Sequence, residues 1–264
     1  MNTLRDQRHE GWVLAAYPDP KTSRPLIGAG FGLDVMATDH PQSDPLNPHL
    51  FLEPSSAQLW QAAGLEPGQL QKILDRFDRD LAAWKKKKYR KKIRAHTLTP
   101  ELTEEEATRL LRISAIQSIH NAKAYCRNFD QLSASQQMAL SQLVFQMGVN
   151  LEEFVQFLST INGNAGSSEL LQASASIEAE REHWKEVQRT LIESQWARSY
   201  TSRATTVIAM LDPHYAQDPQ EAVHQVEAVL HPPVKHHRKK ASAGVHKTGN
   251  KQKGTSSHHN QKST

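Results

Sequence analysis

Two carboxylates near the start of the chain have the residue types and spacing needed for acid–base chemistry. Glu10 ends a short helical pattern over residues 2–10, and Asp19 follows it after the apolar run WVLAAY. Hydrolysis of a glycosidic bond requires two acids on opposite walls of a cleft, one as general acid and the other as base or nucleophile. Glu10 and Asp19 are therefore the candidate catalytic pair.

The residues around these two acids predict a β-hairpin. WVLAAY is typical of a strand, PDPKTSRP of a turn and LIGAGFGL of a returning strand, so residues 12–34 should form a hairpin or small meander. Glycines 28, 30 and 32 alternate along the second strand and leave one of its faces without side chains. That face either admits a bulky ligand close to the backbone or belongs to a tightly bent hairpin with no ligand.

The rest of the body predicts helices. Apolar residues recur with helical spacing over 56–84, and Thr103 begins a further helix with a capping box. Later helices are expected at 134–148, 150–158, 183–196, 202–212 and 218–230. Residues 35–55 should be an irregular connection and 159–180 a surface insertion. A small β element followed by many helices indicates an α+β class that is mostly α.

Composition and hydropathy set the broad class of protein. Of the 264 residues, 38% are hydrophobic, which is enough for a substantial core, and no stretch of about 18 apolar residues predicts a transmembrane helix. The first residues lack the apolar region of a secretory signal, so we expect a protein that is cytoplasmic as synthesised. Cys126 is the single cysteine, which excludes a disulfide within the chain.

The charges are unevenly distributed along the chain. Eight of the 32 Lys and Arg lie in residues 231–264, which contain no acid, so residues 1–230 hold 24 bases against 28 acids. The run KKKKYRKKIR at 85–94 supplies eight of those 24 bases. We expect residues 231–264 to form a disordered tail. Both basic segments are either solvated surface or sites that attract an anionic envelope polymer, and no specific nucleic-acid binding is expected.

Four motifs, taken in chain order, resemble the phage-type lysozymes, which are muramidases of glycoside hydrolase family 24. The motifs are EGWVLAAYPD, IGAG, ALSQLVFQMG and HWKEVQRTLIESQWARSYTSRA. The resemblance covers about residues 2–34 and 101–212. It implies a two-lobed fold within residues 1–230, in which a small hairpin lobe is joined by a long helix to a helical lobe. Residues 35–100 would be an added segment.

The resemblance assigns a role to particular positions. Glu10 matches the catalytic glutamate, which acts as general acid, and Asp19 matches the catalytic aspartate. Arg203 matches an arginine that lies beside the glutamate, and Trp196 a structural tryptophan. The substrate-binding positions implied by the motifs are Gly30, Phe145 and Gln146. No cofactor and no metal are implied, and the expected partner is bacterial peptidoglycan, bound by a monomer that reaches the wall after release or export.

One position departs from the family pattern. The family has a threonine directly before IGAG, where it helps to hold the attacking water, and here that residue is Leu26. Thr22 or Ser23 could hold the water instead, and Asp34 is a spare acid. The expected activity is hydrolysis of the β-1,4 bond between N-acetylmuramic acid and N-acetylglucosamine. The alternatives are a lytic transglycosylase that uses Glu10 alone, and a weak enzyme that mainly binds glycan.

Overall fold

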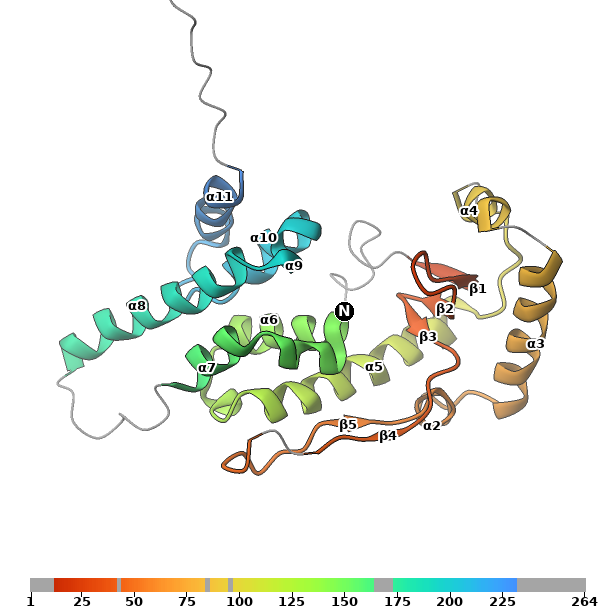
Figure 1. Ribbon diagram of the computed structural model, residues 1–264, viewed down its shortest axis with the longest axis horizontal. Helices are drawn as coiled ribbons and strands as arrows, with labels where there is room; N and C mark the ends of the chain where they lie inside the picture. Colours follow the sequence, from red (N-terminus) through yellow and green to blue (C-terminus); the bar gives the residue numbers. More distant parts are fainter. Residues whose placement is uncertain (1–11, 42–43, 84–85, 95–96, 164–172, 232–264) are drawn as a thin grey trace, which may run out of the picture. The chain divides into compact units, whose positions relative to one another are not determined.

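The α+β class predicted from the sequence is confirmed, because a small antiparallel sheet precedes a long series of helices. Figure 1 shows the computed structural model, which describes residues 12–41, 44–83, 86–94, 97–163 and 173–231. The helix expected over 2–10, which includes Glu10, lies outside the described residues, as does the tail from residue 232 onward. Contacts group residues 1–232 into one unit.

The predicted hairpin is confirmed as a three-stranded sheet. Strands β1 (Val13–Pro18), β2 (Pro25–Gly28) and β3 (Phe31–Gly32) pair antiparallel in the order β1-β2-β3. The tight turn between β2 and β3 uses Gly28 at φ +62° and Gly30 at φ +90°. Residues other than glycine rarely adopt such φ angles, so these two glycines permit the turn.

The outer edge of β1 is covered by the segment that precedes α5 (Glu104–Tyr125). The Leu14 carbonyl accepts hydrogen bonds from the backbone N–H groups of Glu101 (2.7 Å) and Leu102 (3.0 Å). The Glu101 carboxylate accepts from the Ala16 N–H at 2.8 Å, and it is also bound by Arg76 of α3 (Pro67–Ala83). These contacts satisfy the polar groups of an edge strand that would otherwise be open to pairing with another chain.

Residues 35–55 are more regular than expected. They contain a second antiparallel pair, β4 (Thr38–Asp39) and β5 (Leu52–Glu53). Strands of two residues are too short to show an alternating pattern, which is why the sequence did not predict them. The Asn121 side chain of α5 bonds both the N–H (2.9 Å) and the carbonyl (2.8 Å) of Leu52, and so fixes this arm to the long helix.

The first group of helices surrounds the sheet. Helix α2 (Ser56–Ala62) and α5 begin at capping boxes formed by Ser55 and Thr103, in which side chains satisfy the first backbone N–H groups. The basic run forms a further helix, α4 (Lys86–Arg94), which follows α3. This group shares one core with the sheet, whose largest buried side chains include Ile27, Trp60, Phe77, Tyr89 and Leu110.

The second group of helices follows α5. Its members are η1 (Phe129–Gln131), α6 (Ala134–Met147), η2 (Gly148–Glu153), α7 (Val155–Gly163), α8 (Ala173–Ile192), α9 (Gln195–Ser199), α10 (Thr201–Ala209) and α11 (Pro219–Leu230). The expected insertion over 159–180 is shorter than predicted, because α7 and α8 extend into it from both sides. Alanine and glutamate in ASASIEAE favour a helix despite the serines.

Helix α5 connects the two groups. Leu110, in its first half, belongs to the core around the sheet, and Ala122 and Tyr125, near its end, belong to the core of the later helices. Figure 1 shows α5 running from the sheet towards α6. Across the described ranges, no helix is both long and apolar enough to cross a membrane.

Candidate active site

A cleft of about 720 Å³ lies between the hairpin and the second group of helices. Three parts of the chain line it: residues 17, 19, 20, 26, 29 and 30 of the hairpin, 145–146 at the end of α6, and 199–203 at the junction of α9 and α10. The described positions that the sequence singled out for a site all line this one cleft, namely Asp19, Gly30, Phe145, Gln146 and Arg203. Glu10 lies outside the described residues.

Asp19 occupies the turn that follows β1, where its side chain is held by the backbone. Its Oδ1 accepts hydrogen bonds from the N–H groups of Lys21 (2.8 Å) and Thr22 (2.6 Å) and from the Thr22 hydroxyl (3.0 Å). Burial alone raises the pKa of Asp19, but the bonds from Thr22 and Lys21 and the Lys21 charge outweigh it and lower the pKa below its usual value. Asp19 is therefore an ionised carboxylate at neutral pH.

Thr22 and Asp34, two other polar residues of the hairpin, are held by contacts within it. The Thr22 hydroxyl donates to Asp19, and it accepts from the Arg24 N–H at 3.3 Å, so it is committed to shaping the turn. Asp34 forms an ion pair with Arg24 at 3.1 Å. Thr22, Ser23 and Asp34 are all absent from the cleft lining. The suggestion that one of them takes part directly is therefore not supported.

Leu26 presents an apolar side chain to the cleft. It lies in β2, paired with Tyr17 of β1, and both residues line the cleft together with Asp19. Because side chains alternate between the two faces of a strand, the neighbouring Ile27 is buried in the core while Leu26 is only partly buried. The wall beside Asp19 thus lacks a hydroxyl at the position where the resemblance expects one.

The opposite wall of the cleft is rich in hydroxyl groups. The residues before Arg203 contribute four in succession: Ser199, Tyr200, Thr201 and Ser202. The sequence interpretation did not identify them, although the hydroxyl-rich run SYTS directly before Arg203 was a usable signal. Hydroxyls that both donate and accept hydrogen bonds suit a ligand rich in hydroxyl and amide groups, such as a glycan.

A hydrogen bond crosses the cleft between these two walls. The Lys21 ammonium donates to the Tyr200 hydroxyl at 3.3 Å and lies 5.8 Å from the centre of the tyrosine ring. Lys21 belongs to the hairpin turn and Tyr200 to the α9–α10 junction. Both side chains are exposed, so this contact can open at small cost.

Gln146, Phe145 and Arg203 are each held by contacts or burial where they line the cleft. The Trp196 indole N–H donates to Gln146 Oε1 at 3.1 Å. An indole only donates, so this bond orients the Gln146 amide and leaves its NH₂ group to donate elsewhere. Phe145 packs with Ala29 and Trp12 in a small apolar cluster. Arg203 is only 8% exposed, which places a cation at the buried end of the site.

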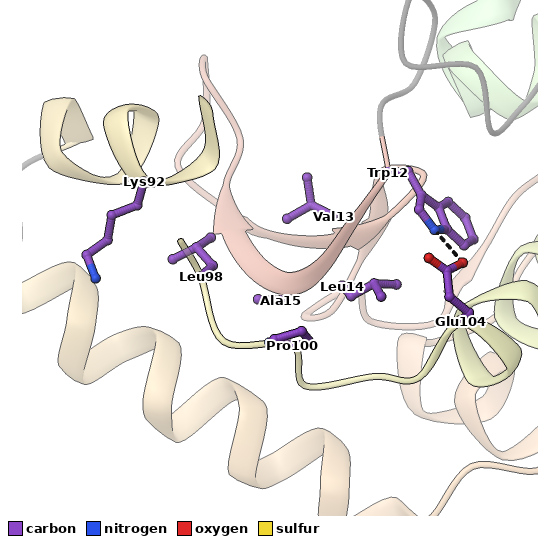
Figure 2. Close-up of a pocket in the computed structure, with 8 residues that line it drawn as sticks. All are labelled: Trp12, Val13, Leu14, Ala15, Lys92, Leu98, Pro100 and Glu104. Atoms are coloured by element: carbon purple, nitrogen blue, oxygen red, sulfur yellow. Dashed lines mark hydrogen bonds between the residues drawn. The ribbon is translucent and has the colours of Figure 1, made fainter. Parts of the chain in front are cut away.

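A second cavity, on the outer face of β1, lacks a comparable set of groups. Its volume is about 190 Å³, and it lies between β1 and the residues that precede α5. Figure 2 shows its lining, which is mainly apolar, and the Trp12 indole N–H that donates to Glu104 Oε2 at 2.8 Å. This cavity holds no pair of acids. The described residues also contain no cluster of His, Cys, Asp and Glu suited to a metal ion.

Comparison with known proteins does not assign a family. No protein-family model matches this sequence, and no curated protein matches it significantly. The functional interpretation therefore depends on the residues that line the cleft.

Proposed function

We propose that this protein is a peptidoglycan muramidase with a two-lobed, lysozyme-like fold. The observation that carries the proposal is the convergence of Asp19, Phe145, Gln146 and Arg203 on one cleft. The resemblance to phage-type lysozymes selected these positions from segments far apart in the sequence. An open cleft lined by an ionised acid, an aromatic side chain and several hydroxyls suits a glycan strand.

Glu10 is the proposed general acid. It lies two residues before Trp12, so chain connectivity alone keeps their Cα atoms within about 7 Å of each other. Trp12 and Phe145 both pack against the buried pair Ala29 and Leu111, and of these residues Ala29 and Phe145 line the cleft. The resemblance assigns the catalytic glutamate to this position, two residues before Trp12. Glu10 would protonate the glycosidic oxygen as the bond to the anomeric carbon breaks.

Asp19 is the proposed partner on the hairpin. Three hydrogen bonds to one oxygen and the nearby Lys21 charge keep it ionised, so it can stabilise the positive charge that develops on the sugar ring. Among the described residues, no hydrogen bond is made to its Oδ2. We propose that this oxygen accepts a proton from an attacking water, whose oxygen would bond to the anomeric carbon from the opposite face.

Leu26 supports a second candidate, a lytic transglycosylase. An apolar side chain beside Asp19 cannot hold a water by hydrogen bonding. In a transglycosylase Glu10 would give its proton to the departing glycosidic oxygen as that bond breaks. The C6 hydroxyl of the N-acetylmuramic acid would then bond to the anomeric carbon of the same sugar and give its proton to the Glu10 carboxylate, so that a 1,6-anhydro ring forms and no water is consumed. This reaction requires Glu10 as the acid and places little demand on Asp19 as a base.

The products distinguish these reactions. Purified peptidoglycan would be incubated with the full-length protein and with its Glu10→Gln and Asp19→Asn variants, and the released fragments identified by mass spectrometry. New reducing ends indicate hydrolysis, and anhydro ends indicate transglycosylation. Glu10→Gln should release neither. If the wild-type protein releases no fragments, both enzyme proposals are wrong, and co-sedimentation with peptidoglycan then tests the remaining alternative of glycan binding.

A further inference from the structure

Helix α4 has a sequence dense in cations, and one of its residues anchors it to the core. Tyr89 is fully buried, its ring lies 6.0 Å from that of Phe77, and its hydroxyl accepts a hydrogen bond from Arg76. This anchor orients the helix. Lys87 and Lys91, which are four residues apart and nearly opposite Tyr89 on the helical circumference, are both exposed.

The charge of α4 contrasts with that of the rest of the body. Residues 85–94 hold eight bases and no acid, and the remainder of residues 1–230 holds 16 bases against 28 acids. The body outside this run therefore has a formal charge of −12, and α4 carries a local charge of opposite sign. An anionic polymer would be repelled by most of this body and attracted to α4.

Lys87 and Lys91 are exposed on the side of α4 away from Tyr89, whereas Lys92 lines the cavity beside β1. Within α4, like charges recur at spacings of three and four residues, which weakens a helix. Two acids close to its anchor, Asp80 and Glu101, are already bound by Arg76. A bound polyanion would relieve the repulsion between the like charges along α4. The dense positive charge of the helix would then favour binding of that polyanion.

We propose that α4 binds a phosphodiester polymer attached to peptidoglycan, an inference that rests on the proposed function. Helix α4 packs against β1, the strand that leads into Asp19, so a polymer on this helix lies close to the strand that forms one wall of the cleft. Lysine pairs with phosphate as a compact charge. An anionic bilayer is a poorer occupant, because the aromatic side chain of α4 is buried within the protein and cannot enter lipid.

The test uses co-sedimentation with insoluble peptidoglycan in the full-length chain, so that the basic tail is the same in every sample. All proteins carry Glu10→Gln to prevent digestion. Lys87→Gln with Lys91→Gln is compared with Lys72→Gln with Lys185→Gln, which removes two exposed lysines elsewhere. Each protein is measured on peptidoglycan that bears poly(glycerol phosphate) and on the same material after chemical removal of that polymer, across a range of salt concentrations.

The α4 variant should bind the polymer-bearing material at least fivefold more weakly at low salt, and the control pair within twofold of the parent. The slope of log K against log salt should fall by about 1.5, since two phosphate contacts are lost. All three proteins should bind the stripped material equally. Equal binding of the α4 variant and control to polymer-bearing material would overturn the proposal. The proposal would also be overturned if the α4 variant lost binding to anionic vesicles or duplex DNA, measured in parallel, and kept its binding to the polymer-bearing peptidoglycan.

The binding assay is independent of catalysis. If the product analysis shows no cleavage by the wild-type protein, yet the α4 variant still loses binding to free poly(glycerol phosphate), then the muramidase proposal fails and the α4 surface stands. If the wild-type protein cleaves peptidoglycan and the α4 variant binds the polymer normally, the muramidase proposal stands and the α4 proposal fails.

Discussion

Removing the Glu101 carboxylate should loosen the strand that leads to the candidate active site. This carboxylate accepts hydrogen bonds from the Ala16 N–H in β1 and from Nε and Nη2 of Arg76 in α3. The side chains of Glu101 and Arg76 are 16% and 26% exposed. Without Glu101, the Ala16 N–H loses this acceptor, and Asp80 is the carboxylate that still binds Arg76, at 2.8 Å.

The expected loss of stability follows from this geometry. Removal of one partner from a fully buried ion pair costs about 3–5 kcal/mol, and a hydrogen bond to a charged group contributes about 1.5–3 kcal/mol. Partial exposure and the remaining Asp80 reduce these figures. We expect Glu101→Ala to lower the free energy of unfolding by about 2–4 kcal/mol. Glu101→Gln, which keeps one acceptor oxygen, should lower it by about 1–2 kcal/mol.

Urea unfolding of the full-length protein, followed by circular dichroism, measures both changes. The matched control is Glu182→Gln, because Glu182 pairs with Lys185 at a surface site where the side chains are 67% and 60% exposed. Such a pair is worth only about 0.2–1 kcal/mol. A double-mutant cycle of Glu101→Gln with Arg76→Gln should give a coupling of about 1 kcal/mol or more. A coupling near zero, or a loss no greater than in the control, would refute the reasoning.

Three further predictions concern the cleft. Thr22→Val removes a hydrogen bond to the ionised Asp19 carboxylate, so the pKa of Asp19 should rise. The acid limb of the pH–rate profile should then move to higher pH. An unchanged acid limb would show that Asp19 does not control it. Leu26→Thr introduces a hydroxyl on the hairpin wall of the cleft. It should raise the release of reducing ends, measured by mass spectrometry, by about threefold to tenfold. No increase would mean that the placement of the attacking water does not limit the rate. Tyr200→Phe removes the hydrogen bond that Lys21 donates to Tyr200. Insoluble peptidoglycan should then be digested faster, while the rate of digestion of short soluble fragments stays the same. Slower digestion of both substrates would indicate that Tyr200 contacts the substrate.

Local elements of this fold are predictable because their causes are local. The capping box at Thr103 and the apolar spacing after it predict α5, since both act within a few residues. The hairpin follows in the same way from two apolar runs separated by turn residues, and from glycines that permit the positive φ angles of its second turn. The expected insertion at 159–180 was too long because small, polar residues mask a helical tendency that packing reinforces. The arm of β4 and β5 depends on a contact with Asn121, far away in the sequence.

The sequence by itself determined the candidate residues, because Asp19, Phe145 and Arg203 were chosen from the residue types of short motifs and from the order of those motifs along the chain. Only the tertiary structure decided that these residues share a cleft, since α5 and the packing of two cores bring their segments together. The structure also decided that Leu26 rather than Ile27 lines the wall, and that Arg24 holds Asp34 away from it. Strand register and ion-pair partners depend on contacts between segments, and the spacing of residues along one segment cannot specify them.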